Sequence, residues 1–149
     1  MTYNKPRDTY FETQVLTATP QKLQLMLLEG ALRYGRQAAD HWREGRIYEG
    51  GEAVIGCQRI VTELLRALKP ELAPALVENV SSVYRFVFRT LVEAGMKRDA
   101  GKLAEAMRLL EIERETWRQV CERLATQGNV PAPHGLLIPP VSSGFALEA

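Results

Sequence analysis

The sequence predicts an all-α protein, an antiparallel up-down four-helix bundle, and three observations lead to this fold class. Of the eight prolines, only Pro70 and Pro74 fall between residues 21 and 130, so long helices can run on either side of one break. Apolar residues recur at steps of three and four through four segments, which is the period of a helix with a buried face. The connections between these segments are short, so consecutive helices should lie antiparallel.

The first helix is predicted to begin at Thr19-Pro20. A threonine side chain can accept a hydrogen bond from the first helical turn, and proline fits the first helical position. Gly45 should end this helix, since glycine is common just beyond a helix C-terminus. Its core stripe is expected to consist of Leu23, Met26, Leu27, Ala31, Tyr34 and Ala38.

The second helix is predicted to begin at either Ile47 or Gly51, because adjacent glycines weaken its start, and to end at Leu68. Cys57 falls on its apolar stripe and Cys121 falls on that of the fourth helix. Both cysteines are therefore interpreted as small core residues rather than as nucleophiles. The second core stripe is expected to consist of Val54, Cys57, Val61, Leu64, Leu65 and Leu68.

The third helix is predicted to start near Pro74 and to stop at Gly95, and the fourth to start after the capping residue Asp99. In the fourth helix Trp117 is interpreted as an interior anchor, and Arg114 is the one polar residue in the core stripe. The third stripe is expected to consist of Leu76, Val80, Val83, Val87, Leu91 and Ala94. The fourth is expected to consist of Leu103, Met107, Leu110, Trp117, Cys121 and Leu124.

Two segments lie outside the predicted bundle, which spans residues 19–125. Residues 1–18 form a polar lead with a few apolar side chains. Residues 126–149, called the C-terminal tail below, hold four prolines and three glycines and cannot continue a helix. Because the tail is nevertheless rich in apolar side chains, we hypothesise that it docks on an apolar face of the same chain. Those side chains are Leu136, Leu137, Ile138, Val141, Phe145 and Leu147.

Composition and motifs exclude several classes of function. A net charge of +1 argues against nucleic acid and against a polybasic membrane surface as partners. No stretch is long and apolar enough to suggest a membrane span, and no secretory signal is readable, so the cytoplasm is the expected location. Neither His41 nor His134 follows a glutamate by three residues, and no phosphate-binding loop is present. We therefore predict no metal, no cofactor and no enzymatic activity.

The first and third predicted helices are apolar around most of their circumference, which is more than a bundle core requires. Two interpretations are open. The excess surface can be covered by residues 1–18, by the C-terminal tail or by a second copy, or it can form a groove for a helix or extended peptide of another protein. The first interpretation leads to a structural or regulatory bundle that homodimerises through its apolar faces.

The residues also resemble a known family. Residues 10–23 read Y-F-E-T-Q-V-L-T-A-T-P-Q-K-L, and this stretch resembles the opening V-x-T-A-x-P-x-x-L of the flagellin export chaperones of the FliS family. The resemblance continues in order to residue 124 and includes the later pair Arg114 and Trp117. The chain departs from the family pattern at Gly56-Cys57, at Gly95 and at Glu113, which stands where the family has an apolar residue.

The resemblance implies a cytoplasmic, non-enzymatic chaperone. FliS-like proteins bind the C-terminal segment of new flagellin, keep it from polymerising before export, and pass it to the export apparatus. The implied partners are thus flagellin and the flagellar export apparatus, with the protein itself a monomer or a weak homodimer. Residues 1–18 would act as an N-terminal cap over part of the client site.

The resemblance also suggests client-binding residues. Tyr10 and Val15 match the cap segment, and Tyr84 and Phe86 match the family's aromatic residues on the third helix. Phe88 lies one turn after Tyr84. A second apolar strip on the first helix, outside its predicted core stripe, completes the expected client surface; it consists of Leu25, Leu28 and Leu32. The alternative for each of these residues is a place in the core, since aromatic side chains at helical spacing usually pack internally.

Overall fold

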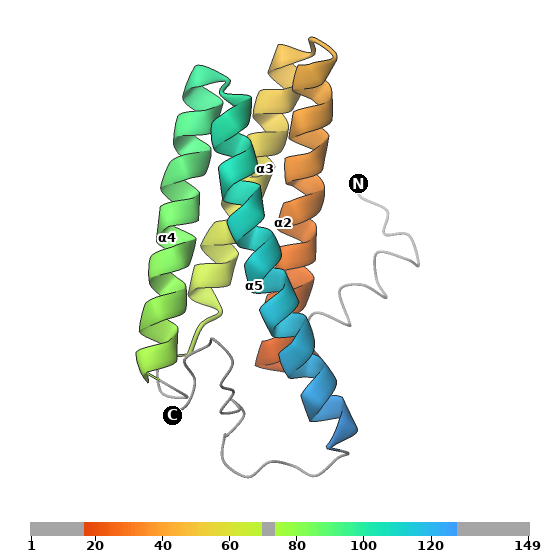
Figure 1. Ribbon diagram of the computed structural model, residues 1–149, viewed down its shortest axis with the longest axis vertical. Helices are drawn as coiled ribbons and strands as arrows, with labels where there is room; N and C mark the ends of the chain where they lie inside the picture. Colours follow the sequence, from red (N-terminus) through yellow and green to blue (C-terminus); the bar gives the residue numbers. More distant parts are fainter. Residues whose placement is uncertain (1–16, 70–73, 128–149) are drawn as a thin grey trace, which may run out of the picture.

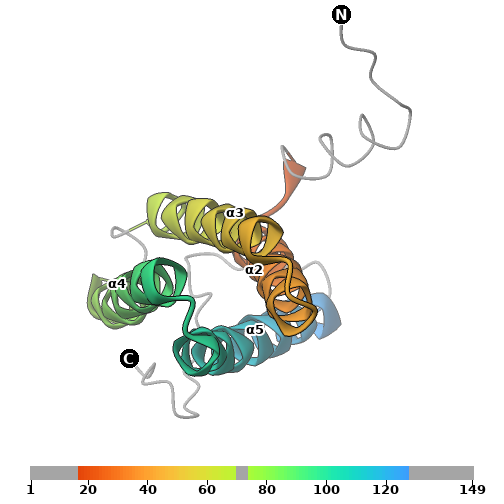
Figure 2. The same ribbon diagram turned by 90° about the horizontal axis from the view of Figure 1, so that it is seen from above.

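The computed structural model describes residues 17–69 and 74–127, and these residues hold four helices (Figure 1). Successive helices run in opposite directions. Seen from above, they occupy the four corners of a bundle in chain order (Figure 2), and the last packs against the first as well as against its predecessor. The prediction of an all-α antiparallel bundle is confirmed. The helices are α2 (Pro20–Arg43), α3 (Ile47–Arg66), α4 (Pro74–Lys97) and α5 (Ala100–Thr126).

Both predicted capping residues are found where the sequence places them. The Thr19 hydroxyl accepts a hydrogen bond from the backbone N–H of Lys22 at 3.1 Å, and the Asp99 carboxylate accepts one from Lys102 at the same distance. Each satisfies a backbone donor that the first helical turn leaves without a partner. Gly45, with φ of 80°, follows α2 as expected. The cap segment predicted for residues 1–18 and the C-terminal tail lie outside the described residues, apart from their innermost two residues.

The predicted end of α4 at Gly95 is wrong, because the helix continues to Lys97. The residue that turns the chain out of the helix is Arg98, which adopts a left-handed conformation with φ of 52°. A Cβ atom at Gly95 would stand 3.4 Å from the Val54 side chain, an ordinary van der Waals distance, so this position lies directly against α3. For the start of α3 the sequence allowed two positions, Ile47 and Gly51, and the helix begins at the earlier one, Ile47.

The predicted core face of α2 is right for Ala31 and Ala38, which are buried, and wrong for the rest of the stripe, whose other members are only partly buried or exposed. Leu25, Leu28 and Leu32, expected on a second outward strip, are buried in the core, whereas Tyr34 is 40% exposed. Because α2 is apolar around most of its circumference, periodicity predicts the helix but not which side faces inward. The inward side is the one that carries Gly35, against which the Met107 side chain of α5 packs.

Large side chains from neighbouring segments pack against three glycines of α2 and α3. A Cβ atom on Gly35 would collide with Met107, one on Gly56 would collide with the Tyr34 ring, and one on Gly50 would collide with the Trp42 indole. A glycine inside a helix weakens it by about 1 kcal/mol relative to alanine. Here the missing side chains let large neighbours pack directly against the helix backbone, which offsets that loss.

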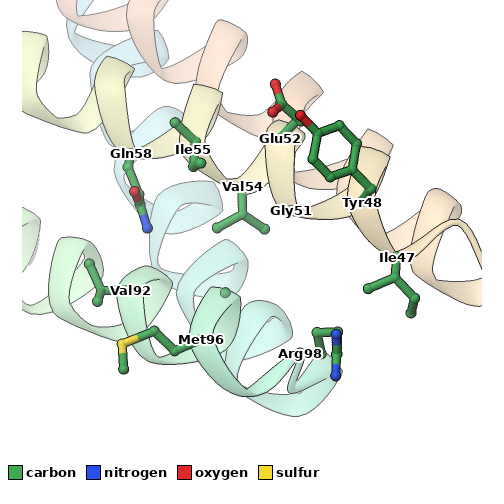
Figure 3. Close-up of a pocket in the computed structure, with 11 residues that line it drawn as sticks. Ile47, Tyr48, Gly51, Glu52, Val54, Ile55, Gln58, Val92, Met96 and Arg98 are labelled. Atoms are coloured by element: carbon green, nitrogen blue, oxygen red, sulfur yellow. The ribbon is translucent and has the colours of Figure 1, made fainter.

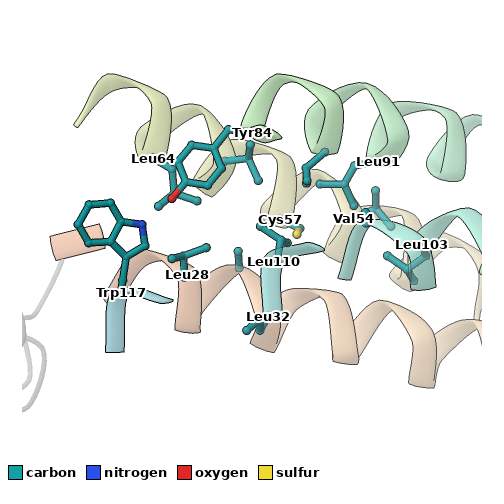
Figure 4. Close-up of a cluster of buried hydrophobic side chains, with 14 of the residues drawn as sticks. Leu28, Leu32, Val54, Cys57, Leu64, Tyr84, Leu91, Leu103, Leu110 and Trp117 are labelled. Carbon is teal, nitrogen blue, oxygen red and sulfur yellow. The ribbon is translucent and has the colours of Figure 1, made fainter. Parts of the chain in front are cut away.

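The other three core stripes are confirmed for most of their members (Figure 4). Trp117 is buried, as predicted for an interior anchor, and Cys57 is fully buried. Six predicted members are only partly buried and pack against the core from its edge: Leu65, Leu68, Val83, Met107, Cys121 and Leu124. The fully buried members are Val54, Cys57, Val61, Leu64, Leu76, Val80, Val87, Leu91, Ala94, Leu103, Leu110 and Trp117.

Candidate functional site

An apolar groove runs between α3 and α4 (Figure 3). It lies near the end of the bundle that carries the turns from α2 to α3 and from α4 to α5, and these turns are seen in Figure 1. Its volume of about 500 Å³ is within the range of sites that bind ligands or peptide side chains. We call it the α3–α4 groove. It is lined by Ile47, Tyr48, Gly51, Glu52, Val54, Ile55 and Gln58 of α3 and by Val92, Gly95, Met96 and Arg98 of α4 and the turn after it.

Large apolar side chains remain exposed along this groove. Met96 is 77% exposed and Tyr48 is 75% exposed, and Ile47 and Ile55 each keep just under half of their surface in contact with solvent. Singly exposed apolar residues are ordinary, but a group around one groove is typical of an interaction surface. The remaining large apolar residues that are exposed within the described residues, Tyr34, Phe86 and Ile112, line neither this groove nor the second pocket described below.

Two glycines keep the groove hollow. Gly51 of α3 has no atom within 4 Å of the position where a Cβ would stand, so this place is open space. Gly95 faces it from α4 and lies beside Val54, which forms the floor. Larger residues at these two positions would fill the space between the helices.

The groove carries little net charge. Two of its lining side chains are charged: the carboxylate of Glu52 and the guanidinium of Arg98. A hydrogen bond to Glu52 raises the pKa of the Tyr48 phenol, so this ring stays neutral at physiological pH. A partner that fits the groove therefore has to offer apolar surface and needs no strong charge of either sign.

A second pocket, of about 540 Å³, lies on the opposite side of the bundle between α2 and α5. Its character differs, because charged side chains surround it. Arg36 forms an ion pair with Glu111 at 3.6 Å, Arg43 forms one with Asp40 at 2.8 Å, and Arg108 stands at the edge. An apolar partner would remove these charged groups from water without offering them hydrogen bonds, which is unfavourable. This pocket is the weaker candidate for an apolar partner.

Of the six predicted client-binding residues that the structure describes, four are not on the surface. Leu25, Leu28, Leu32 and Tyr84 are buried in the core, and Tyr10 and Val15 lie outside the described residues. The Tyr84 hydroxyl donates a hydrogen bond of 2.6 Å to the side-chain oxygen of Gln24. In this structure the four buried residues have almost no solvent-exposed surface with which to contact a partner.

The Gln24 amide in turn donates to the backbone carbonyl of Leu64 at 3.1 Å, so this chain of hydrogen bonds joins α2, α3 and α4. Burial raises the pKa of Tyr84 well above its ordinary value, which keeps its hydroxyl protonated as a donor. In this structure Tyr84 therefore has a structural role.

The two predicted phenylalanines lie on different flanks of α4. Phe88 precedes Val92 by one helical turn, so it lies on the flank that faces α3 and continues the groove side of the helix. It is half-buried and packs against the core. Phe86 is two residues away, which places it on another face, and it is 41% exposed. The structure therefore does not bring the predicted set together in one site.

Sequence reasoning missed the residues that line the α3–α4 groove. Tyr48 and Ile55 are seven residues apart and so share one face of α3, on the side away from the predicted stripe through Val54 and Cys57. These off-stripe apolar residues were the available signal. Excess apolar surface is predicted for α2 and α4 alone, although α3 carries apolar residues off its core stripe as well.

A carboxyl group lies partly buried on α5. Burial raises the pKa of Glu113 from an ordinary 4.5 to about 7, and its charge in turn raises the pKa of Tyr84. Within residues 17–69 and 74–127, no ion pair and no side-chain hydrogen bond compensates this carboxyl. Glu113 is one of the positions at which the sequence departs from the FliS pattern.

The described residues offer binding surface rather than reactive groups. They contain no group of three or more histidine, cysteine, aspartate or glutamate side chains that could hold a metal ion. Burial raises the pKa of the Cys57 thiol to about 12, so the thiolate is absent at neutral pH. None of the helices described here is both long and apolar enough to cross a membrane. The exposed apolar side chains around the α3–α4 groove are suited to contact with another polypeptide.

Comparison of the sequence with known proteins identifies the family. The family model described as Flagellar protein FliS matches residues 3–124. A "Flagellar secretion chaperone FliS" of Bacillus subtilis (strain 168) is 32% identical over 122 residues, which cover 82% of this chain and 90% of the relative. The protein of the same name from Salmonella typhimurium (strain LT2) is 29% identical over 78% of this chain and 87% of its own. "Flagellar secretion chaperone FliSB" of Pseudomonas aeruginosa is 30% identical over 71% of this chain and 84% of its own. These relatives carry the name of a chaperone, not of an enzyme, and the chain belongs to the FliS family of flagellar secretion chaperones.

Proposed function

We propose that this protein is a cytoplasmic export chaperone that binds the C-terminal segment of flagellin, prevents its premature polymerisation and delivers it to the flagellar export apparatus. Its membership of the FliS family supports the general role. The observation that carries the binding mode is the α3–α4 groove, where large apolar side chains are exposed around a nearly uncharged hollow. We propose this groove as the main contact surface for the client.

The groove fits one apolar face of an amphipathic helix. It extends from Ile47 to Gln58, which is about 16 Å along α3 at 1.5 Å per residue, or three helical turns. A client helix of that length offers three or four side chains on one face. A segment that is disordered before binding must also be ordered, and this lowers the net affinity so that release at the export apparatus stays possible.

Two isoleucines of similar exposure test the location of the client. Ile55 is 45% exposed in the groove, and Ile112 is 54% exposed on α5, away from it. Full burial of an isoleucine is worth about 1.5–3 kcal/mol, and a client can bury only the exposed half of Ile55, which leaves about 1 kcal/mol. Ile55→Ser should therefore weaken binding about fivefold, whereas Ile112→Ser should leave it unchanged.

The measurement is isothermal titration calorimetry of the full chain with a peptide of the flagellin C-terminal segment, with circular dichroism to follow helix formation. Equal losses of client affinity in the two isoleucine variants would contradict the placement of the client in the α3–α4 groove. Gly51→Leu provides a stronger block, since its side chain would occupy the open space in the groove. The absence of heat and of gained helicity with unaltered protein at tens of micromolar would contradict the chaperone function itself.

The homodimeric bundle remains the alternative that these experiments must separate. Light scattering of the protein alone should show a monomer, or a weak dimer that the client peptide dissociates. An obligate dimer that dissociates with Ile55→Ser, together with no response to flagellin, would support the alternative instead.

The N-terminal segment is a further part of the proposal. We assign Tyr10 and Val15 to a cap over part of the client site. Tyr10→Ala should then change client affinity in calorimetry while thermal unfolding stays nearly the same. A large loss of stability with unchanged affinity would assign Tyr10 to the core.

A further inference from the structure

We propose that the second half of the C-terminal tail, from about Val141 to Leu147, lies in the α3–α4 groove of the same chain and excludes other occupants from it. The contact is a property of this chain alone and can be tested without any client. Its consequence, competition with flagellin, rests on the proposed function.

Charge selects the groove for this segment. Residues 135–147 carry no ionisable side chain, while Val141, Phe145 and Leu147 supply apolar surface. The α2–α5 pocket would bury three arginines and two acidic residues under such a segment, and none of these would gain a partner. The α3–α4 groove would bring one carboxylate and one guanidinium to its edge and would cover Tyr48 and Met96, the two most exposed large apolar side chains of the described residues. Of the two pockets described, only the α3–α4 groove matches the tail in polarity.

Chain length sets which part of the tail can reach the groove. Helix α5 has 27 residues and ends at the opposite end of the bundle from the groove (Figure 1). The helix is about 40 Å long at 1.5 Å per residue and the groove takes up about 16 Å of that length, so the near edge of the groove, at Gln58, lies about 24 Å from the end of α5 along the bundle. The chain must also pass across α4, which adds a helix diameter of about 10–12 Å. An extended chain advances about 3.3 Å per residue, so about 11 residues beyond Gln127 span this path of about 35 Å. This count leads to about Ile138 and lets the segment after Pro139 and Pro140 lie in the groove.

The local sequence suits an extended occupant of this size. Pro139 and Pro140 directly precede Val141, and consecutive prolines favour an extended conformation with few alternatives, which lowers the entropy lost on docking. Val141 to Leu147 extends about 20 Å at 3.3 Å per residue, close to the length of about 16 Å between Ile47 and Gln58. The tether also supplies a local concentration in the millimolar range, so a contact of modest strength is sufficient.

The tail is not part of what this chain shares with the family, because the family match ends at residue 124. A client competing with the tail would bind more weakly by the fraction of time that the groove is free. A tail that occupies the groove nine-tenths of the time would lower the apparent affinity about tenfold.

Two methionine methyl groups make the contact measurable by NMR in the full chain. Met96 lies in the α3–α4 groove, and Met107 packs against Gly35 on the opposite side of the bundle, so it is the matched control. A nitroxide spin label is attached at Ser143→Cys, with Cys121→Ser to remove the other accessible thiol; buried Cys57 should not react. We expect strong broadening of the Met96 methyl signal, little effect on Met107, and recovery of Met96 when the label is reduced.

Three outcomes would overturn the proposal. Equal broadening of the Met96 and Met107 methyl signals would mean that the tail has no preferred binding site on the bundle. Broadening that persists with Phe145→Ser and Leu147→Ser together would show that these side chains do not hold the tail. Broadening of isotope-labelled Met96 by spin label on a second, unlabelled copy would show that the contact is between chains.

Competition is then measured separately with the flagellin peptide. The Phe145→Ser, Leu147→Ser variant should bind the peptide several-fold more tightly than the unaltered chain. Equal affinities, with the NMR contact present, would overturn the competition while leaving the docked tail. No binding by either protein would instead contradict the proposed function, which the NMR experiment does not require.

Discussion

Glu113 offers a direct test of the electrostatics of the bundle through the substitution Glu113→Gln. Its side chain lies partly buried on α5 with a pKa of about 7 in place of an ordinary 4.5, and burial is the cause. Each pH unit between these values corresponds to about 1.4 kcal/mol, so ionised Glu113 destabilises the fold by at most about 3 kcal/mol. Because part of the side chain still contacts water, we expect about 2 kcal/mol.

The direction in which stability changes with pH depends on whether the folded or the unfolded chain ionises at the lower pH. Below pH 4.5 the carboxyl is protonated in both states and glutamate is equivalent to glutamine. Between pH 4.5 and 7 the unfolded chain loses this proton and the folded chain keeps it, so the free energy of unfolding falls as pH rises. Above pH 7 the penalty is complete. Glu113→Gln should therefore match the unaltered protein near pH 4.5 and exceed its stability by about 2 kcal/mol at pH 8.

The assay is urea unfolding followed by circular dichroism at several pH values from 4.5 to 8. Glu78→Gln is the matched control, because it removes an exposed carboxyl from α4 and should reproduce the profile of the unaltered protein. A difference between Glu113→Gln and the unaltered protein that stays constant across the pH range would refute the reasoning. A gain in stability for both glutamine variants would do so as well.

Two further predictions concern packing and hydrogen bonds. Tyr84→Phe leaves the Gln24 side-chain oxygen buried without its donor and should lower the free energy of unfolding by about 1–3 kcal/mol, as measured by urea unfolding. The adjacent glycines of α3 should respond in opposite directions. Gly51→Ala adds a methyl group in open space and should stabilise the protein by up to about 1 kcal/mol, whereas Gly50→Ala displaces the Trp42 indole and should destabilise it. A stabilising Gly50→Ala, or unchanged Trp42 fluorescence in that variant, would contradict the described contact.

Signals that act within one helical turn predicted the fold well. The caps at Thr19 and Asp99 depend on a side chain and a backbone group three residues apart, and the sequence displays both. The core stripes of α3, α4 and α5 follow from apolar residues at steps of three and four, and most of their predicted members are buried. These features need no knowledge of the neighbouring helices.

Features that depend on contacts between helices were predicted poorly. The inward face of α2 is set by Gly35 and by the Met107 side chain that packs there, and neither can be recognised before the helices are placed. The end of α4 lies two residues beyond the predicted Gly95, because Arg98 and not a glycine adopts the left-handed conformation that ends the helix. The groove was missed because its two walls come from different helices.

The glycine contacts of the bundle are distributed unevenly, and this bears on how the groove can change its width. Close contacts of large side chains with Gly35, Gly50 and Gly56 all involve α2, α3 and α5. Helix α4 packs more sparsely against its two neighbours than α2 does against α3. Sparse packing lowers the free energy of local opening, so α4 should be the helix that moves first. An occupant too wide for the groove as it stands would thus gain room by tilting α4 outward against the other three helices, and amide hydrogen exchange along α4 would report that motion.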